Sequence, residues 1–370
     1  MPEDSNNRIL PSNWTRAGVA LAAGAALLLG GGYVHANAAT GQSGSSSSAS
    51  AATAVSSAAV SDVVDAADAF LDTLSTSQQG QVLLDFTEAN ATAWSNLPCG
   101  SSCRVGIQLG SLSTAQLTAA KAVLQAAAGT ASGTGYDQIS QVLAADDVLG
   151  QSAGGYGSGN YYLAFLGTPS ETGTWQLHFG GHHLAVNLTY EGGEVTGASP
   201  YFVGVEPSSW TSNGTTYAPL SGQRNGMLTM LNSLSSSQLT QAKLSQSFGD
   251  VLLGPGKDGQ FPTTKVGLPV SGLSSAQKQL VLAAITPWVK VVDDSTSSEL
   301  LATYASELDQ TYIAYSGNAG LSSQGDYVRI DGPGVWIEFV CQNGVIYRNQ
   351  VHYHTVYRDH TRDYGGEFSF

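Results

Sequence analysis

Histidine is the residue type whose placement in this sequence points most directly to chemistry. The chain contains 7 His, and apart from His35 all of them fall in two short windows. The six residues are His178, His182 and His183 in the first window, and His352, His354 and His360 in the second. Neutral imidazole binds zinc, copper, iron and nickel, so the clustering favours a divalent metal site. The alternative is that these side chains hydrogen-bond within a sheet or lie on its surface.

The His-Tyr-His segment at residues 352–354 has the spacing of a chelating pair. Alternate residues of a strand project from the same face, so both imidazoles are expected on one side of a sheet. His182 and His183 are adjacent and would point to opposite faces, unless the Gly-Gly pair before them forms a bulge. The predicted ligands are His182, His183, His352 and His354, of which either His182 or His183 faces the site. His178 and His360 are expected to orient a ligand or the substrate.

Charged residues near the second window are catalytic candidates. Glu338 is an isolated carboxylate in an apolar stretch, and it is predicted to be a general base, a fourth metal ligand or a salt-bridged core residue. Arg358 and Asp359 follow the His-Tyr-His segment and belong either to ion-paired strand ends or to a site for an anionic group of the substrate. Asp363 is expected to support them.

Three functions are compatible with these residues. With zinc as the favoured ion, three protein ligands and an open position would lower the pKa of a bound water to about 7, for attack on an ester or amide. With copper as the second choice, the same imidazoles would support oxidation, with Tyr353 and Tyr357 nearby. The third is a secreted binding module without catalysis. The sequence lacks His-Glu-x-x-His and phosphate-loop motifs.

The histidine windows lie in two stretches that are predicted to be successive strands, residues 160–205 and 326–357. In the second stretch, apolar residues alternate up to Asn343-Gly344, which is typical of a tight hairpin turn, and the returning strand is expected from Val345 to Val356. Helical segments flank both stretches. We therefore predict an α+β fold with helices flanking antiparallel β-meanders, as one domain over residues 59–370. A division near residue 222 is the alternative.

A five-residue motif recurs at four predicted helix starts. Each copy places Ser three residues before Gln, the pattern of a capping box in which two side chains satisfy backbone donors at the first helical turn. The copies are Leu74–Gln78, Leu112–Gln116, Leu234–Gln238 and Leu273–Gln277. Their spacing is irregular, so we interpret them as reused helix starts and assign them no chemistry.

The amino-terminal region is predicted to direct export. Residues 1–38 contain basic residues, an apolar run from Ala17 to Val34 and an Ala-Asn-Ala site, as in a cleaved signal peptide, although the run could also remain as a membrane anchor. Residues 39–58 are rich in Ser and Ala and are predicted to be a flexible linker. Cys99 and Cys103 are spaced for a small disulfide loop, which fits a secreted or periplasmic protein.

Composition limits the partners. The chain of 370 residues has 14 Lys+Arg and 28 Asp+Glu, for a formal net charge of −14, with 42% hydrophobic residues. The hydrophobic content suffices for a core. The negative charge argues against nucleic acid and anionic membranes, which need basic surfaces. A small-molecule or polymeric substrate is therefore the expected partner, with no membrane contact after signal cleavage, and the sequence does not indicate the oligomeric state.

Several segments together resemble the exported bacterial family DUF3500, a domain of unknown function. They are Gly181–Leu188 preceded by Trp175, Tyr327–Pro333 with Ile337 and Glu338, and His352–Asp359 with Asp363–Gly365. The resemblance covers roughly residues 60–370 and implies an exported protein, but no activity.

The resemblance also sorts the candidate residues. The Gly-His-His and His-x-His elements match the family pattern, as do Glu338, Arg358, Asp359 and Asp363. Positions 178 and 360 are not histidine in that pattern, which weakens both as ligands. This sequence departs from the pattern at Gln223-Arg224, where acidic residues are usual, and it lacks the usual Asn before the His-x-His element.

Overall fold

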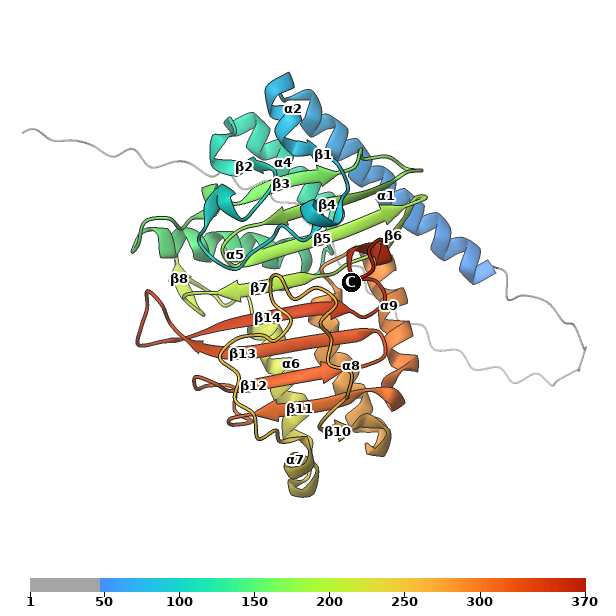
Figure 1. Ribbon diagram of the computed structural model, residues 1–370, viewed down its shortest axis with the longest axis vertical. Coiled ribbons are helices and arrows are strands. Elements are labelled where there is room, and N and C mark those ends of the chain that lie inside the picture. The colour runs from blue at the N-terminus through green and yellow to red at the C-terminus, as the bar shows by residue number, and fades with distance from the viewer. Residues whose placement is uncertain (1–46) are drawn as a thin grey trace, which may run out of the picture. The chain divides into compact units, whose positions relative to one another are not determined.

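A long sheet with helices on one face forms the body of the protein (Figure 1). The computed structural model describes the backbone of residues 47–370 and the side chains of residues 59–370. The helices are α1 (Ser47–Asp72), α2 (Thr76–Val82), α3 (Glu88–Ala91), α4 (Thr114–Ala127), α5 (Gly135–Gly150), α6 (Ser221–Asn232), α7 (Ser236–Ala242), α8 (Ser275–Val289) and α9 (Asp294–Ser306). The described residues thus form the predicted α+β fold.

The sheet has 12 strands, and its main path runs β1-β3-β4-β5-β7-β14-β13-β12-β11-β10. In addition, β2 pairs with β3 and β6 pairs with β5, while β8 and β9 form a separate hairpin. The strands are β1 (Leu83–Leu84), β2 (Ile107–Gln108), β3 (Tyr162–Leu166), β4 (Thr174–Gly180), β5 (Leu184–Glu191), β6 (Glu194–Gly197), β7 (Tyr201–Val205), β8 (Trp210–Ser212), β9 (Thr215–Tyr217), β10 (Leu268–Pro269), β11 (Tyr312–Ser316), β12 (Tyr327–Asp331), β13 (Val335–Asn343) and β14 (Val351–Asp359). The two predicted meanders share this sheet, joined by antiparallel pairing of β7 with β14.

The two halves of the sheet repeat the same succession of elements. Helices α4 and α5 precede β3, β4, β5 and β7, and helices α8 and α9 likewise precede β11 to β14. Equivalent backbone bonds recur: Gly204 N donates to His183 O at 2.7 Å, and His360 N donates to Gly334 O at 2.8 Å. The boundary between the halves lies close to residue 222, but the sheet is continuous across it.

The repeated helix starts follow this organisation. All four predicted capping boxes form, at Ser75, Ser113, Ser235 and Ser274. Within the first half Gln116 bonds to Gln78, 38 residues away, and within the second half Gln277 bonds to Gln238, 39 residues away. The irregular spacing along the chain therefore reflects two pairs of helix starts, one in each half.

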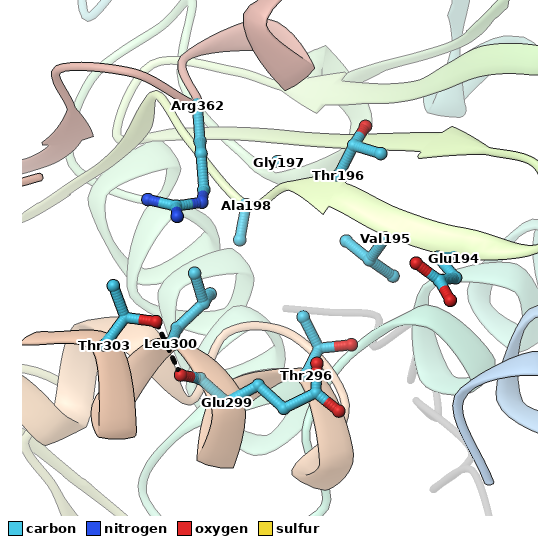
Figure 2. A pocket seen from close by; sticks show the side chains of 10 residues that line it. All are labelled: Glu194, Val195, Thr196, Gly197, Ala198, Thr296, Glu299, Leu300, Thr303 and Arg362. Atoms are coloured by element: carbon cyan, nitrogen blue, oxygen red, sulfur yellow. Dashed lines mark hydrogen bonds between the residues drawn. The ribbon is translucent and has the colours of Figure 1, made fainter. Parts of the chain in front are cut away.

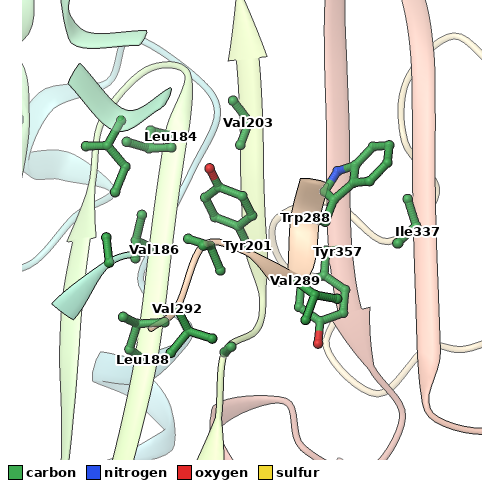
Figure 3. Close-up of a cluster of buried hydrophobic side chains, with 14 of the residues drawn as sticks. Leu184, Val186, Leu188, Tyr201, Val203, Trp288, Val289, Val292, Ile337 and Tyr357 are labelled. Carbon is green, nitrogen blue, oxygen red and sulfur yellow. The ribbon is translucent and has the colours of Figure 1, made fainter. Parts of the chain in front are cut away.

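One face of the sheet packs against the helices and forms the main core. Figure 3 shows Tyr201, Val203 and Tyr357 of the central strands against Trp288 and Val289 of α8, all buried. Burial of large apolar side chains of this kind stabilises a fold by about 1.5–3 kcal/mol each. Along β14 the odd-numbered residues face these helices, as the bond from Trp288 to Thr355 Oγ1 at 2.8 Å shows.

The opposite face of the sheet is covered by irregular chain. Residues 244–267 cross the strands of the second half, and residues 92–106 cross those of the first (Figure 1). Trp94, Phe248 and Val251 from these segments form a smaller buried cluster with Phe202 and Val356 of the sheet. The even-numbered residues of β14, which include both predicted histidine ligands, face this coil-covered side.

The predicted hairpin at Asn343-Gly344 is longer than expected. Strand β13 ends at Asn343, but β14 begins only at Val351, so seven residues connect them. Glu206 explains the longer turn, since its Oε1 accepts hydrogen bonds from the backbone N of Ile346 at 2.8 Å and of Tyr347 at 2.7 Å. A buried carboxylate directly after β7 therefore holds the turn open.

The predicted signal segment lies outside the described residues. Helix α1 begins at Ser47, so that residues 47–58, which the composition assigns to a linker, are helical. Among the described helices, none combines the length and the apolar character needed to cross a membrane.

Candidate metal centre

Three histidines from both halves of the chain meet on the coil-covered face. His352 and His354 lie on β14, and His183 lies in the connection between β4 and β5. Suitable ligand atoms of the three side chains all lie within 4.8 Å of one another, and all three residues are buried. The prediction that the two histidine windows converge on a metal-capable group is therefore confirmed.

Gly204 on β7 makes this convergence possible. It pairs with His354 in the sheet, and its backbone N is bonded to the His183 carbonyl. A Cβ at position 204 would lie 2.6 Å from His183 Cδ2 and 2.9 Å from His354 Cδ2, closer than side chains tolerate. The absent side chain leaves room for both imidazoles above the strand.

A second group shares His183. Asp146, near the end of α5, lies with its Oδ1 3.0 Å from His182 Nδ1 and 4.0 Å from His183 Nδ1. Asp146, His182 and His183 again offer ligand atoms within 4.8 Å of one another. His182 and His183 do not point to opposite faces of a strand, because both lie in a bend. Both side chains belong to a metal-capable group. Sequence reasoning missed Asp146, and no local motif identifies it.

The imidazoles of β14 are oriented by acceptors behind them. His352 Nδ1 lies 2.7 Å from the Asn343 carbonyl, and His354 Nδ1 lies 2.9 Å from Asp250 Oδ1. A carbonyl and a carboxylate can only accept, so both Nδ1 atoms carry the proton and donate. Both Nε2 lone pairs then point into the cluster, where the two Nε2 atoms are 3.2 Å apart. Asp250 was also missed, since it comes from the coil segment.

Burial favours the neutral form of His183 and His352. It lowers the pKa of His183 well below its usual range, with help from the nearby His182, His354 and His352. Burial and the neighbouring His354 lower the pKa of His352 to about 4. Neutral imidazole is the form that binds metal ions, so these two residues can bind an ion at neutral pH.

Glu338 does not join the histidines. Its carboxylate accepts four hydrogen bonds, from Leu252 N at 2.6 Å, Leu253 N at 2.9 Å, Tyr327 Oη at 2.8 Å and Trp336 Nε1 at 2.9 Å. Burial raises the pKa of Glu338, and these donors oppose that effect. The expected base or fourth ligand is instead an anchor that holds the coil segment on the sheet.

The Arg358 guanidinium is also fully engaged in hydrogen bonds and ion pairs within the fold. Its guanidinium is fully buried and donates to the carbonyls of Leu253 and Gly254 and to the carboxylates of Asp258 and Asp363, at 2.8–3.1 Å. These partners use all three of its nitrogens. Of the two roles that the sequence left open for Arg358, the structure shows the ion-paired one: Arg358 ties the coil segment and the carboxy-terminal segment to β14.

The acidic residues after β14 have structural partners. Asp359 accepts bonds from Tyr304 Oη at 2.5 Å and from Thr361 and Arg362, and it faces the helices rather than the histidines. Asp363 accepts from Ser199 Oγ at 2.7 Å and from Arg358 at 2.9 Å. The catalytic role expected for Asp359 has no support in this arrangement.

The remaining histidines lie outside the cluster. His178 is buried on β4 with its Nε2 3.3 Å from the Ala93 carbonyl, and His360 stacks on Phe261 with ring centroids 4.0 Å apart. Neither belongs to a metal-capable group of the described residues. Cys99 and Cys103 form the predicted disulfide, and Cys341 is a buried free thiol.

His178 should make stability depend on acid. Burial lowers its pKa to about 4, against about 6.5 in an unfolded chain, so between these values the unfolded state binds more protons and stability falls as pH falls. Relative to His178→Gln, the wild type should lose about 2 kcal/mol of unfolding free energy between about pH 7.5 and pH 5. Denaturant titrations of both proteins at the two pH values test this, and an equal loss in both would refute it.

An open cavity lies elsewhere in the protein. A space of about 320 Å³ lies between β6 and α9. Figure 2 shows its lining residues, which include Glu194, Glu299 and Arg362. None of the clustered histidines lines it. Arg362 is bonded to Asp359 at 3.3 Å, so its charge is already paired.

Comparison with known proteins identifies a family without an assigned activity. A family model with the description "Protein of unknown function (DUF3500)" matches residues 56–366. No curated protein and no solved structure matches the chain significantly.

Proposed function

Since the chain belongs to the DUF3500 family, whose description names no reaction, we propose a function from the geometry of the site. The protein is a metal-dependent hydrolase with His183, His352 and His354 as ligands of one divalent ion. Three imidazoles with a further open position are the donor set of catalytic zinc sites, so zinc is the favoured ion.

The facing Nε2 atoms of His352 and His354 carry this proposal. Each residue donates its Nδ1 proton outward, so in the neutral form of both rings two lone pairs face each other at 3.2 Å. Two lone pairs repel each other at that distance, and a cation between or beside them turns the repulsion into attraction. Ligand histidines that donate their other ring N–H to a carboxylate or a carbonyl are typical of zinc sites.

Zinc would supply a bound water with a pKa near 7, which attacks an ester, an amide or a similar bond. The residues of the chain prepare the site for it. The Asn343 carbonyl and Asp250 fix the ligand tautomers, and burial excludes bulk water from the ion. The side chains of Asp250 and His182 are 44% and 12% exposed, which marks the side from which a substrate approaches.

Aromatic side chains surround this approach. Tyr156 packs edge-on against His182, with ring centroids 4.7 Å apart. Tyr347, in the turn before β14, bonds to Ser152 Oγ at 2.9 Å and so connects that turn to the segment after α5. The proposed substrate is a small molecule or a polymer.

Export belongs to the same proposal. The apolar run at residues 17–34 supports a signal peptide, and the disulfide between Cys99 and Cys103 supports an oxidising compartment. The proposed location is therefore secreted or periplasmic.

Elemental analysis of protein purified without a His tag tests the metal. We expect at least one zinc per chain and hydrolysis of ester or amide substrates that stops on chelation and returns with zinc. A copper-type electron paramagnetic resonance signal in the protein as purified would replace the hydrolase with an oxidoreductase. Full zinc loading without turnover on any ester or amide would favour a binding module.

A further inference from the structure

We propose that His183 is shared by two metal ions, and that Asp146 and His182 hold the second one. This inference rests on the proposed function, since the first ion is the one bound by His183, His352 and His354. It adds a second site of different composition, with two imidazoles and one carboxylate, on the other side of the His183 ring.

The second group has the geometry of an ion site. Asp146 is buried and points its Oδ1 toward His182 and His183, at 3.0 Å and 4.0 Å from their Nδ1 atoms. Its other oxygen accepts a hydrogen bond from Gly157 N at 2.9 Å, which fixes the carboxylate. The rings of His182 and His183 lie side by side, with centroids 3.7 Å apart. Imidazole nitrogens and one carboxylate oxygen are a ligand set that zinc accepts.

The orientation of His183 places its two nitrogens in different groups. Its Nδ1 faces Asp146, whereas its Cδ2 lies over Gly204 next to the Cδ2 of His354. In an imidazole ring Nε2 is bonded to Cδ2 and lies on the edge opposite Nδ1. The Nε2 side of the ring therefore belongs with His352 and His354, and the Nδ1 side belongs with Asp146 and His182.

Neither ring nitrogen of His183 has a hydrogen-bond partner among the described residues, although the side chain is only 2% exposed. Polar groups with little access to water are stabilised by a partner. An ion on each side gives both nitrogens a partner.

For His183 to bind two ions, its imidazole must lose one proton. A neutral imidazole has one lone pair and one N–H, so it binds the first ion through the lone pair. Binding of the second ion displaces the N–H proton to water and leaves an imidazolate that joins both ions. The negative charges of the imidazolate and of Asp146 partly compensate the second divalent charge in this buried place.

Copper titration with electron paramagnetic resonance tests the proposal on the full chain. Metal-free protein should bind two Cu²⁺ per chain, and the second equivalent should lower the integrated signal, because an imidazolate couples the two electron spins. Asp146→Asn should bind one Cu²⁺ per chain and show an uncoupled signal of full intensity. Asp147→Asn is the matched control: among the described residues, the Asp147 carboxylate accepts hydrogen bonds from Ser158 alone, so this variant should behave as the wild type.

The outcomes separate this inference from the proposed function. One Cu²⁺ in both the wild type and Asp146→Asn would refute the second site and leave the first intact. Two ions with additive signal intensities would refute the shared ligand. No bound ion in the wild type would overturn both proposals. The signal of the remaining ion in Asp146→Asn also shows that this variant is folded.

Discussion

Replacing His352 and His354 together by alanine is expected to remove the first metal ion and abolish metal-dependent turnover. The substitution takes away two of the three imidazoles of that site and leaves only His183. Loss of a residue that hydrogen-bonds to a ligand weakens metal binding by about 10–100-fold. Loss of two ligands should therefore weaken metal binding by more than about 100-fold. Metal content after dialysis against a weak chelator, together with turnover at saturating zinc, measures the effect.

Two further substitutions show whether the loss of metal is specific to the ligand histidines. Asp250→Asn retains the side-chain size but weakens the acceptor behind His354, and it should lower affinity for the first ion by about 10–100-fold. His178→Gln changes a buried histidine of the same sheet face outside the cluster, and it should keep the wild-type metal content at neutral pH. Unchanged metal content in the double alanine variant would contradict the site.

Replacing Arg358 by alanine should destabilise the protein by about 3–5 kcal/mol, the range for breaking a buried ion pair. The change leaves Asp258 and Asp363 without their shared cation and the carbonyls of Leu253 and Gly254 without their donor. The coil segment that carries Asp250 would lose one of its anchors. Equilibrium unfolding in denaturant measures the difference from the wild type.

Arg362→Ala provides the matched comparison for this effect. Arg362 also pairs with an aspartate of the same region, but its side chain is 36% exposed. Exposed ion pairs contribute below about 1 kcal/mol, so this variant should remain close to the wild type. Equal destabilisation by the two substitutions would show that burial of Arg358 is not the cause.

Local patterns predicted most of the fold. Ser and Gln at a spacing of three satisfy backbone donors within one turn, so the four capping boxes depend on neighbours in sequence and form as expected. The hairpin after Asn343 was predicted too short, because its length is set by Glu206, a partner about 140 residues away.

The positions of site residues could be predicted where they follow from strand periodicity, but not where they depend on contacts with distant parts of the chain. The alternation along β14 places His352 and His354 on one face, as expected from sequence. Asp146 and Asp250 come from a helix end and a coil segment, whose positions no local pattern encodes. Glu338 and Arg358 looked catalytic because isolated charges in apolar strands are unusual. Their hydrogen bonds, which sequence does not reveal, leave them no free group for chemistry.

The centre lies where the two halves of the sheet join at β7 and β14, and it takes His183 from one half and His352 and His354 from the other. An ion bound there would add a cross-link between the two halves, beside the β7–β14 pairing and the hydrogen bonds of Glu206 and Asp363. Ion occupancy and cohesion of the halves are then linked thermodynamically, so each increases the other. The corresponding turn of the second half has Pro333 and Gly334 in place of His182 and His183, and it offers no such cross-link.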